Sequence, residues 1–121
     1  MRLYETAPEL TVMSTTRLPA DWAGVYGRER DVILIDRAMT YTRKRATLVH
    51  ELVHRAYGDD GHARERRCRL ETARLLIDRD GYARAEVMFE GDPWLIAEEL
   101  DVPVEVVFDY REWLGFTTMG R

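Results

Sequence analysis

Hydrophobic and polar residues alternate weakly at the start of the chain and predict strands. Residues 9–16 are rich in β-branched side chains, and two apolar runs, residues 22–26 and 32–35, flank a charged loop at 27–31. A turn at residues 18–21 separates the first segment from the other two. This pattern predicts a short N-terminal antiparallel sheet that includes a hairpin.

Further along the chain, the apolar residues recur at helical spacing. Thr40 or Thr42 can cap a helix that runs to about residue 57, with Gly58 just beyond its end. Further helices are expected over residues 63–77, 82–89, 93–100 and 103–114, followed by a frayed tail. Strands followed by helices predict a small α+β protein.

The composition adds limits on class and compartment. The 121 residues are 45% hydrophobic and 33% charged, which is typical of one folded domain. Cys68 is the single cysteine, so an internal disulfide framework and a multi-cysteine zinc finger are excluded. Neither a membrane span nor a signal peptide is recognisable, and we therefore expect a cytoplasmic protein.

The charge is distributed unevenly. Residues 86–112 contain nine acidic residues and one basic residue, Arg111. The last two predicted helices have helix-turn-helix spacing, but the second of them presents mainly Glu105, Asp109 and Glu112. Because a DNA reader needs a basic surface, direct DNA binding is not expected. An acidic face suits a basic protein partner instead.

The chemistry is concentrated in an H-E-x-x-H motif, His50-Glu51-Leu-Val-His54, on the first predicted helix. The i, i+4 spacing places both imidazoles on one helix face, within reach of a single zinc ion. Glu51 is then positioned as a general base that takes a proton from a metal-bound water. The motif predicts a zinc-dependent hydrolase.

A catalytic zinc site needs a third protein ligand, and the spacing alone leaves several candidates open. Gly58 and His62 lie too far from His54 for the metzincin pattern. Glu65 and Glu71 lie six residues apart on one predicted helix, so only one of them can face the metal. The downstream candidates are Asp59, Asp60, His62, Glu65, Cys68 and Glu71, of which Cys68 is expected to be a small buried residue.

Two segments together resemble a known protease family. Residues 45–54 (RATLVHELVH) and 65–77 (ERRCRLETARLLI) resemble the paired helices of the ImmA/IrrE metallo-endopeptidases, whose second helix reads E-x-x-A-[ND]-x-x-A-A-x-x-L-L. The resemblance covers most of the chain, including residues 94–107. It implies that His50, His54 and Glu65 bind zinc and that Glu51 is the catalytic base. Glu71 remains the second choice for the third ligand.

The resemblance also implies a fold and a substrate. We expect one zincin-like domain over residues 1–121, with strands and the hairpin at 1–38, catalytic helices at 40–80 and acidic helices at 81–115. The chain is similar to compact members from actinobacterial phages and mobile elements. The implied activity is zinc-dependent cleavage of a basic helix-turn-helix repressor, which relieves repression. The alternative is a regulatory protein that binds such a repressor on the same scaffold without cutting it.

The chain departs from the family pattern at Arg69, where the family has Asn or Asp. An arginine cannot accept a hydrogen bond from an imidazole N–H, so another acceptor such as Glu71 or a backbone carbonyl is needed. A zincin also needs a donor for the oxyanion of the tetrahedral intermediate. The candidates for that donor are His62, Tyr57 and Tyr41.

Overall fold

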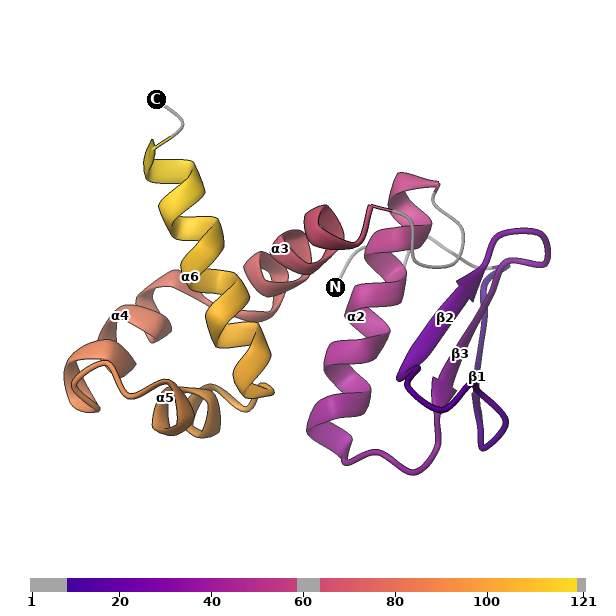
Figure 1. Cartoon of the computed structure of the whole chain (residues 1–121), viewed down its shortest axis with the longest axis horizontal. Coiled ribbons are helices and arrows are strands. Elements are labelled where there is room, and N and C mark those ends of the chain that lie inside the picture. Colours follow the sequence, from indigo (N-terminus) through magenta and orange to yellow (C-terminus); the bar gives the residue numbers. More distant parts are fainter. Residues whose placement is uncertain (1–8, 59–63, 120–121) are drawn as a thin grey trace. The chain divides into compact units, whose positions relative to one another are not determined.

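The computed structural model describes residues 9–58 and 64–119. Within these ranges three strands precede five helices (Figure 1). The strands are β1 (Thr11–Thr15), β2 (Gly24–Gly27) and β3 (Val32–Asp36). The helices are α2 (Tyr41–Tyr57), α3 (Glu65–Leu76), α4 (Arg79–Met88), α5 (Pro93–Leu100) and α6 (Val104–Met119). The prediction of a small α+β protein is confirmed.

The chain divides into two compact units, Met1–Cys68 and Arg69–Arg121. The first contains the sheet, α2 and the first turn of α3, while the second contains the rest of α3 and the helices α4, α5 and α6. No helix in the described part of the chain is long and apolar enough to cross a membrane.

The sheet is mixed, so the prediction of an antiparallel sheet is wrong for one of its strand pairs. The strand order is β1-β3-β2. β2 pairs antiparallel with β3, which confirms the hairpin, whereas β1 pairs parallel with β3 in the register Thr11↔Val32 to Thr15↔Asp36. The connection over residues 16–23 is long enough to place β2 beyond the position that β3 then fills. Alternation of side chains identifies strands but does not identify their neighbours.

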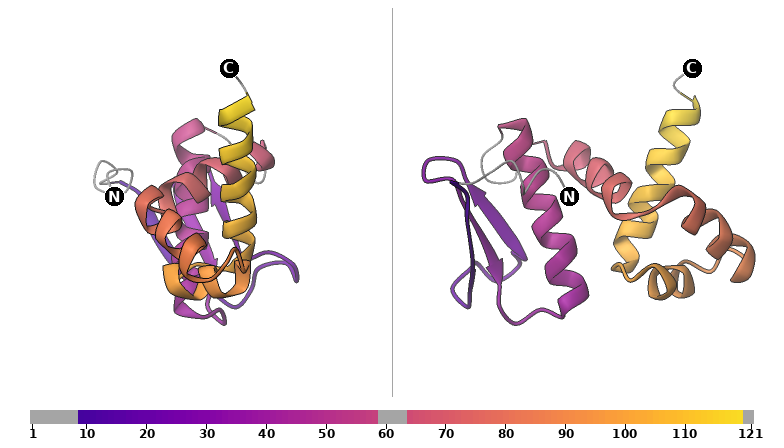
Figure 2. Two further views of the ribbon diagram at one scale, coloured as in Figure 1. Left: turned by 90° about the vertical axis from the view of Figure 1, so that its left-hand side faces the viewer. Right: turned by 180° about the vertical axis from the view of Figure 1, so that it is seen from behind.

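The helix α2 covers one face of the sheet (Figures 1 and 2). Ile33, Ile35 and Tyr26 form a buried core with Leu52 of the helix. Gly24 permits the close approach, because a Cβ atom there would lie 2.6 Å from Cγ2 of Thr47 on α2. The sheet core thus determines where α2, and the motif that it carries, must lie.

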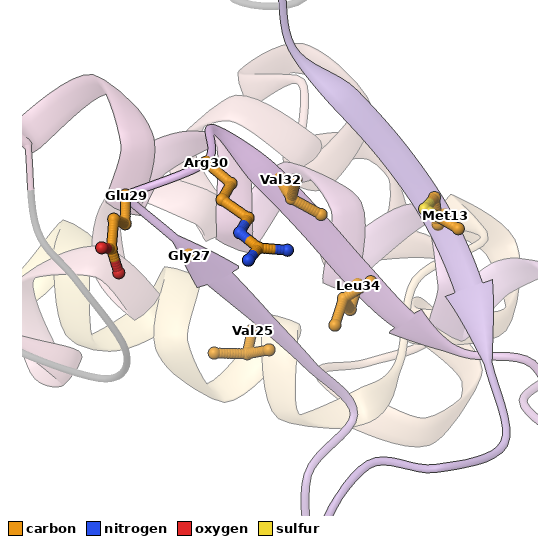
Figure 3. A pocket seen from close by; sticks show the side chains of 7 residues that line it. All are labelled: Met13, Val25, Gly27, Glu29, Arg30, Val32 and Leu34. Atoms are coloured by element: carbon orange, nitrogen blue, oxygen red, sulfur yellow. The ribbon is translucent and has the colours of Figure 1, made fainter.

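The opposite face of the sheet contains a shallow apolar pocket of about 440 Å³ (Figure 3). Met13, Val25, Val32 and Leu34 contribute apolar side chains, with Glu29 and Arg30 from the hairpin loop. Val32 and Leu34 alternate along β3 with Ile33 and Ile35, which face α2. The pocket and the H-E-x-x-H helix therefore lie on opposite faces of the sheet.

The ends of α2 match the sequence prediction. The Thr40 side chain accepts a hydrogen bond from the backbone N–H of Arg43, so Thr40 rather than Thr42 is the N-cap. Gly58 ends the helix in the left-handed region at φ 74°, where its N–H donates to backbone carbonyls of α2. That conformation strains any residue with a side chain, which explains the glycine.

In the second unit, two helix boundaries differ from the prediction. Asp78 accepts a hydrogen bond from the N–H of Gly81 and caps α4, so this helix begins at Arg79 rather than Tyr82. The last helix continues to Met119, whereas we expected fraying from residue 115. Asp92 caps α5 as its position before Pro93 indicates.

A cluster of hydrogen bonds around Arg111 joins α6 to α4 and to the turn between α4 and α5. The Arg111 guanidinium donates to the Tyr82 hydroxyl at 2.9 Å, to Glu86 Oε2 at 3.2 Å and to the Gly91 carbonyl at 2.8 Å. The Tyr82 hydroxyl also donates to Glu86. Arg111, the one basic residue of the acidic segment, is therefore engaged inside its own unit.

Candidate metal centre

The two motif histidines lie on one face of α2. Their ring centroids are 4.9 Å apart, and the two Nε2 atoms are 3.1 Å apart. His54 is fully buried, whereas 18% of the His50 side chain is exposed. One imidazole is therefore held within the protein, and the other lies at the boundary with solvent.

Glu65, at the start of α3, brings its carboxylate to both imidazoles. Its Oε2 lies 2.8 Å from Nε2 of His50, and its Oε1 lies 3.1 Å from Nε2 of His54. Burial raises the pKa of this carboxyl, but the hydrogen bonds with the two histidines outweigh burial and hold the pKa below its usual range. Glu65 is thus a carboxylate at neutral pH, as a metal ligand must be.

The donor set fits a divalent metal ion. Among the described residues, His50, His54 and Glu65 form the cluster whose ligand atoms can share one ion. Two ligands about 2.1 Å from one zinc at a tetrahedral angle lie about 3.4 Å apart. The observed separations of 2.8–3.1 Å need only a few tenths of an ångström of expansion to meet that value.

Access to such an ion is from one side. His54 is closed off, while 41% of the Glu65 side chain is exposed, together with part of His50. A set of three protein ligands would suit a catalytic rather than a structural zinc site, because structural sites use four. The exposed side of the triad is where a further ligand can approach.

Glu51 follows His50 directly and is 2% exposed. Its Cγ lies on the side of α2 that faces the sheet, since a Cβ atom at Gly24 would be 3.4 Å from it. A buried carboxylate that directly follows a metal-ligating residue in the sequence is a candidate proton acceptor. Its neighbours Leu52 and Val53 are both 2% exposed and anchor this part of the helix.

Cys68 contacts the second ring nitrogen of His54. Its Sγ lies 3.3 Å from His54 Nδ1, and both side chains are fully buried. The prediction of a small buried cysteine is confirmed, but its contact with His54 was missed. The spacing could have indicated it, because Cys68 lies three residues after Glu65 and therefore on the same face of α3.

An ion pair that the sequence did not reveal fixes the end of α2 to the β2–β3 loop. Arg55, next to His54, donates to both carboxylate oxygens of Asp31 at 2.6 and 2.8 Å, and the Tyr26 hydroxyl donates to Asp31 Oδ1 at 3.0 Å. The hydrogen bonds from Arg55 lower the pKa of the Asp31 carboxyl. Burial raises the pKa of Tyr26, and its hydrogen bond to Asp31 adds to that shift.

A cation–π contact joins α2 to the first turn of α3. The Arg67 guanidinium lies 3.9 Å from the ring centroid of Tyr57. Tyr57 is one of the predicted oxyanion donors, and the structure gives its ring a role in holding the two ligand-bearing helices together. Its role as a donor stays a prediction.

The remaining candidates among the described residues are not members of the ligand cluster, and the others lie outside the described residues. The Glu71 carboxylate is paired with Arg74 at 2.5 and 2.9 Å. Tyr41 is 76% exposed at the start of α2, about 13 Å along the helix axis from His50. Asp59, Asp60 and His62 lie outside the described residues.

Arg69 has a structural partner of its own. Its guanidinium donates to Oδ1 of Asp109 at 2.9 Å, within the second unit. The position that carries Asn or Asp in the resembled family therefore contributes an ion pair here. Sγ of Cys68 lies beside Nδ1 of one ligand imidazole, that of His54, and an acceptor from Glu71 or a backbone carbonyl stays a prediction.

Comparison of the sequence and structure with known proteins finds no match. No protein-family profile, no curated protein and no solved structure matches the chain.

Proposed function

We propose that this protein is a zinc-dependent endopeptidase with a zincin-like site. The observation that carries the proposal is the convergence of His50, His54 and Glu65 on one point, with the buried Glu51 directly after His50. Two histidines, a carboxylate and an adjacent glutamate are the residues that metal-assisted peptide hydrolysis requires. The likeness of residues 45–54 and 65–77 to ImmA/IrrE metallo-endopeptidases supports the same reading.

The residues have distinct roles in this proposal. A bound zinc ion supplies Lewis acidity and lowers the pKa of water to about 7. Glu51 accepts a proton from the attacking water at a carboxylate oxygen and passes it to the amide nitrogen that leaves. The water oxygen bonds to the carbonyl carbon as the C–N bond breaks, so the products are a carboxylate and an amine.

We further propose that the substrate is a basic protein, namely a helix-turn-helix repressor of a phage or mobile element. Support comes from the acidic segment at residues 86–112 and from the corner between α4 and α5. This corner, residues 87–95, exposes four large apolar side chains, those of Val87, Met88, Trp94 and Leu95. Acidic and apolar groups together suit a basic amphipathic helix. They do not suit DNA, whose phosphates the acidic side chains repel.

The test combines metal content with cleavage. The zinc-loaded protein and its Glu51→Ala variant are incubated with a panel of purified basic helix-turn-helix repressors from phages and mobile elements, and the products are identified by mass spectrometry. We expect one zinc ion per chain in both proteins and cleavage by the wild type alone. Glu71→Gln is the matched control, because it removes a carboxylate that is paired with Arg74 and does not belong to the ligand cluster.

Two results would count against the proposal in different ways. Cleavage by Glu51→Ala at the wild-type rate would exclude Glu51 as the base. A stable complex of the zinc-loaded wild type with uncut repressor would favour a regulatory protein that binds without turnover.

A further inference from the structure

Cys68 and Glu65 reach the same helix from the same face of α3. They are three residues apart, and each contacts His54, Glu65 at Nε2 and Cys68 at Nδ1. His54 is therefore held at both ring nitrogens by one turn of α3. Both His54 and Cys68 have 0% exposure, so bulk water does not compete for this contact.

The sulfur lies on the side of the His54 ring opposite the triad and is not placed to be a fourth ligand. The two nitrogens of an imidazole point away from each other, and Nε2 of His54 is the atom that faces His50 and Glu65. Sγ lies 3.3 Å from the opposite nitrogen. A metal ion bound at Nε2 is separated from the sulfur by the ring itself.

We propose that the Cys68 thiol is a positioning group that holds the His54 ring at Nδ1 and accepts the Nδ1–H of its metal-binding tautomer; this inference rests on the metal centre of the proposed function, not on peptidase activity. When Nε2 gives its lone pair to an ion, the ring proton must be on Nδ1. The thiol sulfur then accepts that N–H. Because both side chains are closed to bulk water, loss of this acceptor removes a buried hydrogen bond to the ring and weakens metal binding.

A thiol differs from the carboxylate or carbonyl that usually fills this position. Those groups only accept, whereas S–H is a weak donor and sulfur a weak acceptor. Without metal, Nε2–H of His54 can donate to Glu65 Oε1 at 3.1 Å while the thiol donates to Nδ1. With metal, the thiol accepts instead. Cys68 therefore satisfies the ring in both states, and the proton shifts without any movement of the helices.

The test is zinc affinity in the full-length chain, measured by competition with a chelator of known affinity. Cys68→Ala removes the hydrogen-bonding atom, and we expect its zinc dissociation constant to rise about tenfold or more. Cys68→Ser keeps a hydroxyl that can donate and accept, and should bind within about threefold of the wild type. Ile33→Val is the control, because it weakens the sheet core without touching a ligand.

A second readout detects the proton directly. Long-range ¹H–¹⁵N spectra of the zinc-loaded wild type should show His54 protonated at Nδ1. Unchanged zinc affinity in Cys68→Ala, equal losses in the Ala and Ser variants, or an unprotonated Nδ1 would each overturn the inference. Metal-free Cys68→Ala is compared with Ile33→Val by urea denaturation, so that a general loss of stability is recognised.

The outcomes separate this inference from the proposed function. A wild-type chain that binds zinc but cuts no repressor refutes the peptidase, while the Cys68 variants still test the inference. If the wild type cuts the repressor while Cys68→Ala binds zinc as tightly as the wild type does, the peptidase is supported and the inference is refuted. A wild type that binds no zinc refutes both.

Discussion

The contact of β2 with α2 permits a quantitative prediction about Gly24. A Cβ atom at this position would lie 2.6 Å from Cγ2 of Thr47 and 3.0 Å from the carbonyl oxygen of Leu34. Both distances are shorter than normal van der Waals contact, so Gly24→Ala must move α2 away from the sheet or distort the strand. Overpacking of this kind typically costs about 1–3 kcal/mol. We expect the free energy of unfolding to fall by that amount.

Gly27, in the same strand, provides the matched control. The nearest atom to a Cβ at Gly27 is the Val32 carbonyl oxygen, at 3.8 Å, which is an ordinary contact. Gly27→Ala should therefore leave stability unchanged or raise it by up to about 1 kcal/mol, because alanine restricts the unfolded chain. The two substitutions have the same chemistry and differ only in the space available.

A second substitution identifies the clashing atom. Thr47→Ser removes Cγ2 and keeps the hydroxyl that contacts Met39 Sδ at 3.9 Å. In the Gly24→Ala protein, Thr47→Ser should recover part of the lost stability. A double-mutant cycle should therefore give an interaction free energy of about 1 kcal/mol between the two substitutions. Urea denaturation followed by far-UV circular dichroism measures all four proteins. Equal stability of the two alanine variants, or absence of coupling with Thr47→Ser, would refute the proposed approach of α2 to β2.

Three further predictions concern charge and metal. The pKa of Asp31 is lowered chiefly by its hydrogen bonds from Arg55, so its stabilisation is complete above about pH 4 and is lost as pH falls through the lower folded value. Urea titrations at pH 6 and pH 3 should therefore show a smaller acid-induced loss for Asp31→Asn than for the wild type, and equal losses would contradict this. Glu65→Gln should raise the zinc dissociation constant by more than about tenfold, while Glu71→Gln should change it less than about twofold, and the reverse order in chelator competition would make Glu71 the ligand. Zinc at a hundred times its dissociation constant should raise the free energy of unfolding by about 2.7 kcal/mol, reversibly with EDTA, and an unchanged melting temperature would exclude a specific site.

Much of the candidate site was predictable from the sequence because its spacing is local. Helical geometry places His50 and His54 on one face without knowledge of the rest of the fold. Thr40 and Gly58 mark the ends of that helix because each caps it through hydrogen bonds to backbone groups only a few residues away. The order of strands before helices is likewise visible in the change of hydrophobic period.

The tertiary structure decided which groups meet across the chain. The parallel pairing of β1 with β3 depends on the path of the connection over residues 16–23, which the alternation of side chains does not specify. Glu65 reaches the histidines from the first turn of α3, and Cys68 of the same turn also reaches His54. Asp31 lies 24 residues before Arg55, and only the folding of the hairpin against α2 brings them together. Local geometry therefore determined the motif, whereas packing of the sheet, α2 and the first turn of α3 determined the third ligand and the groups that hold it in place.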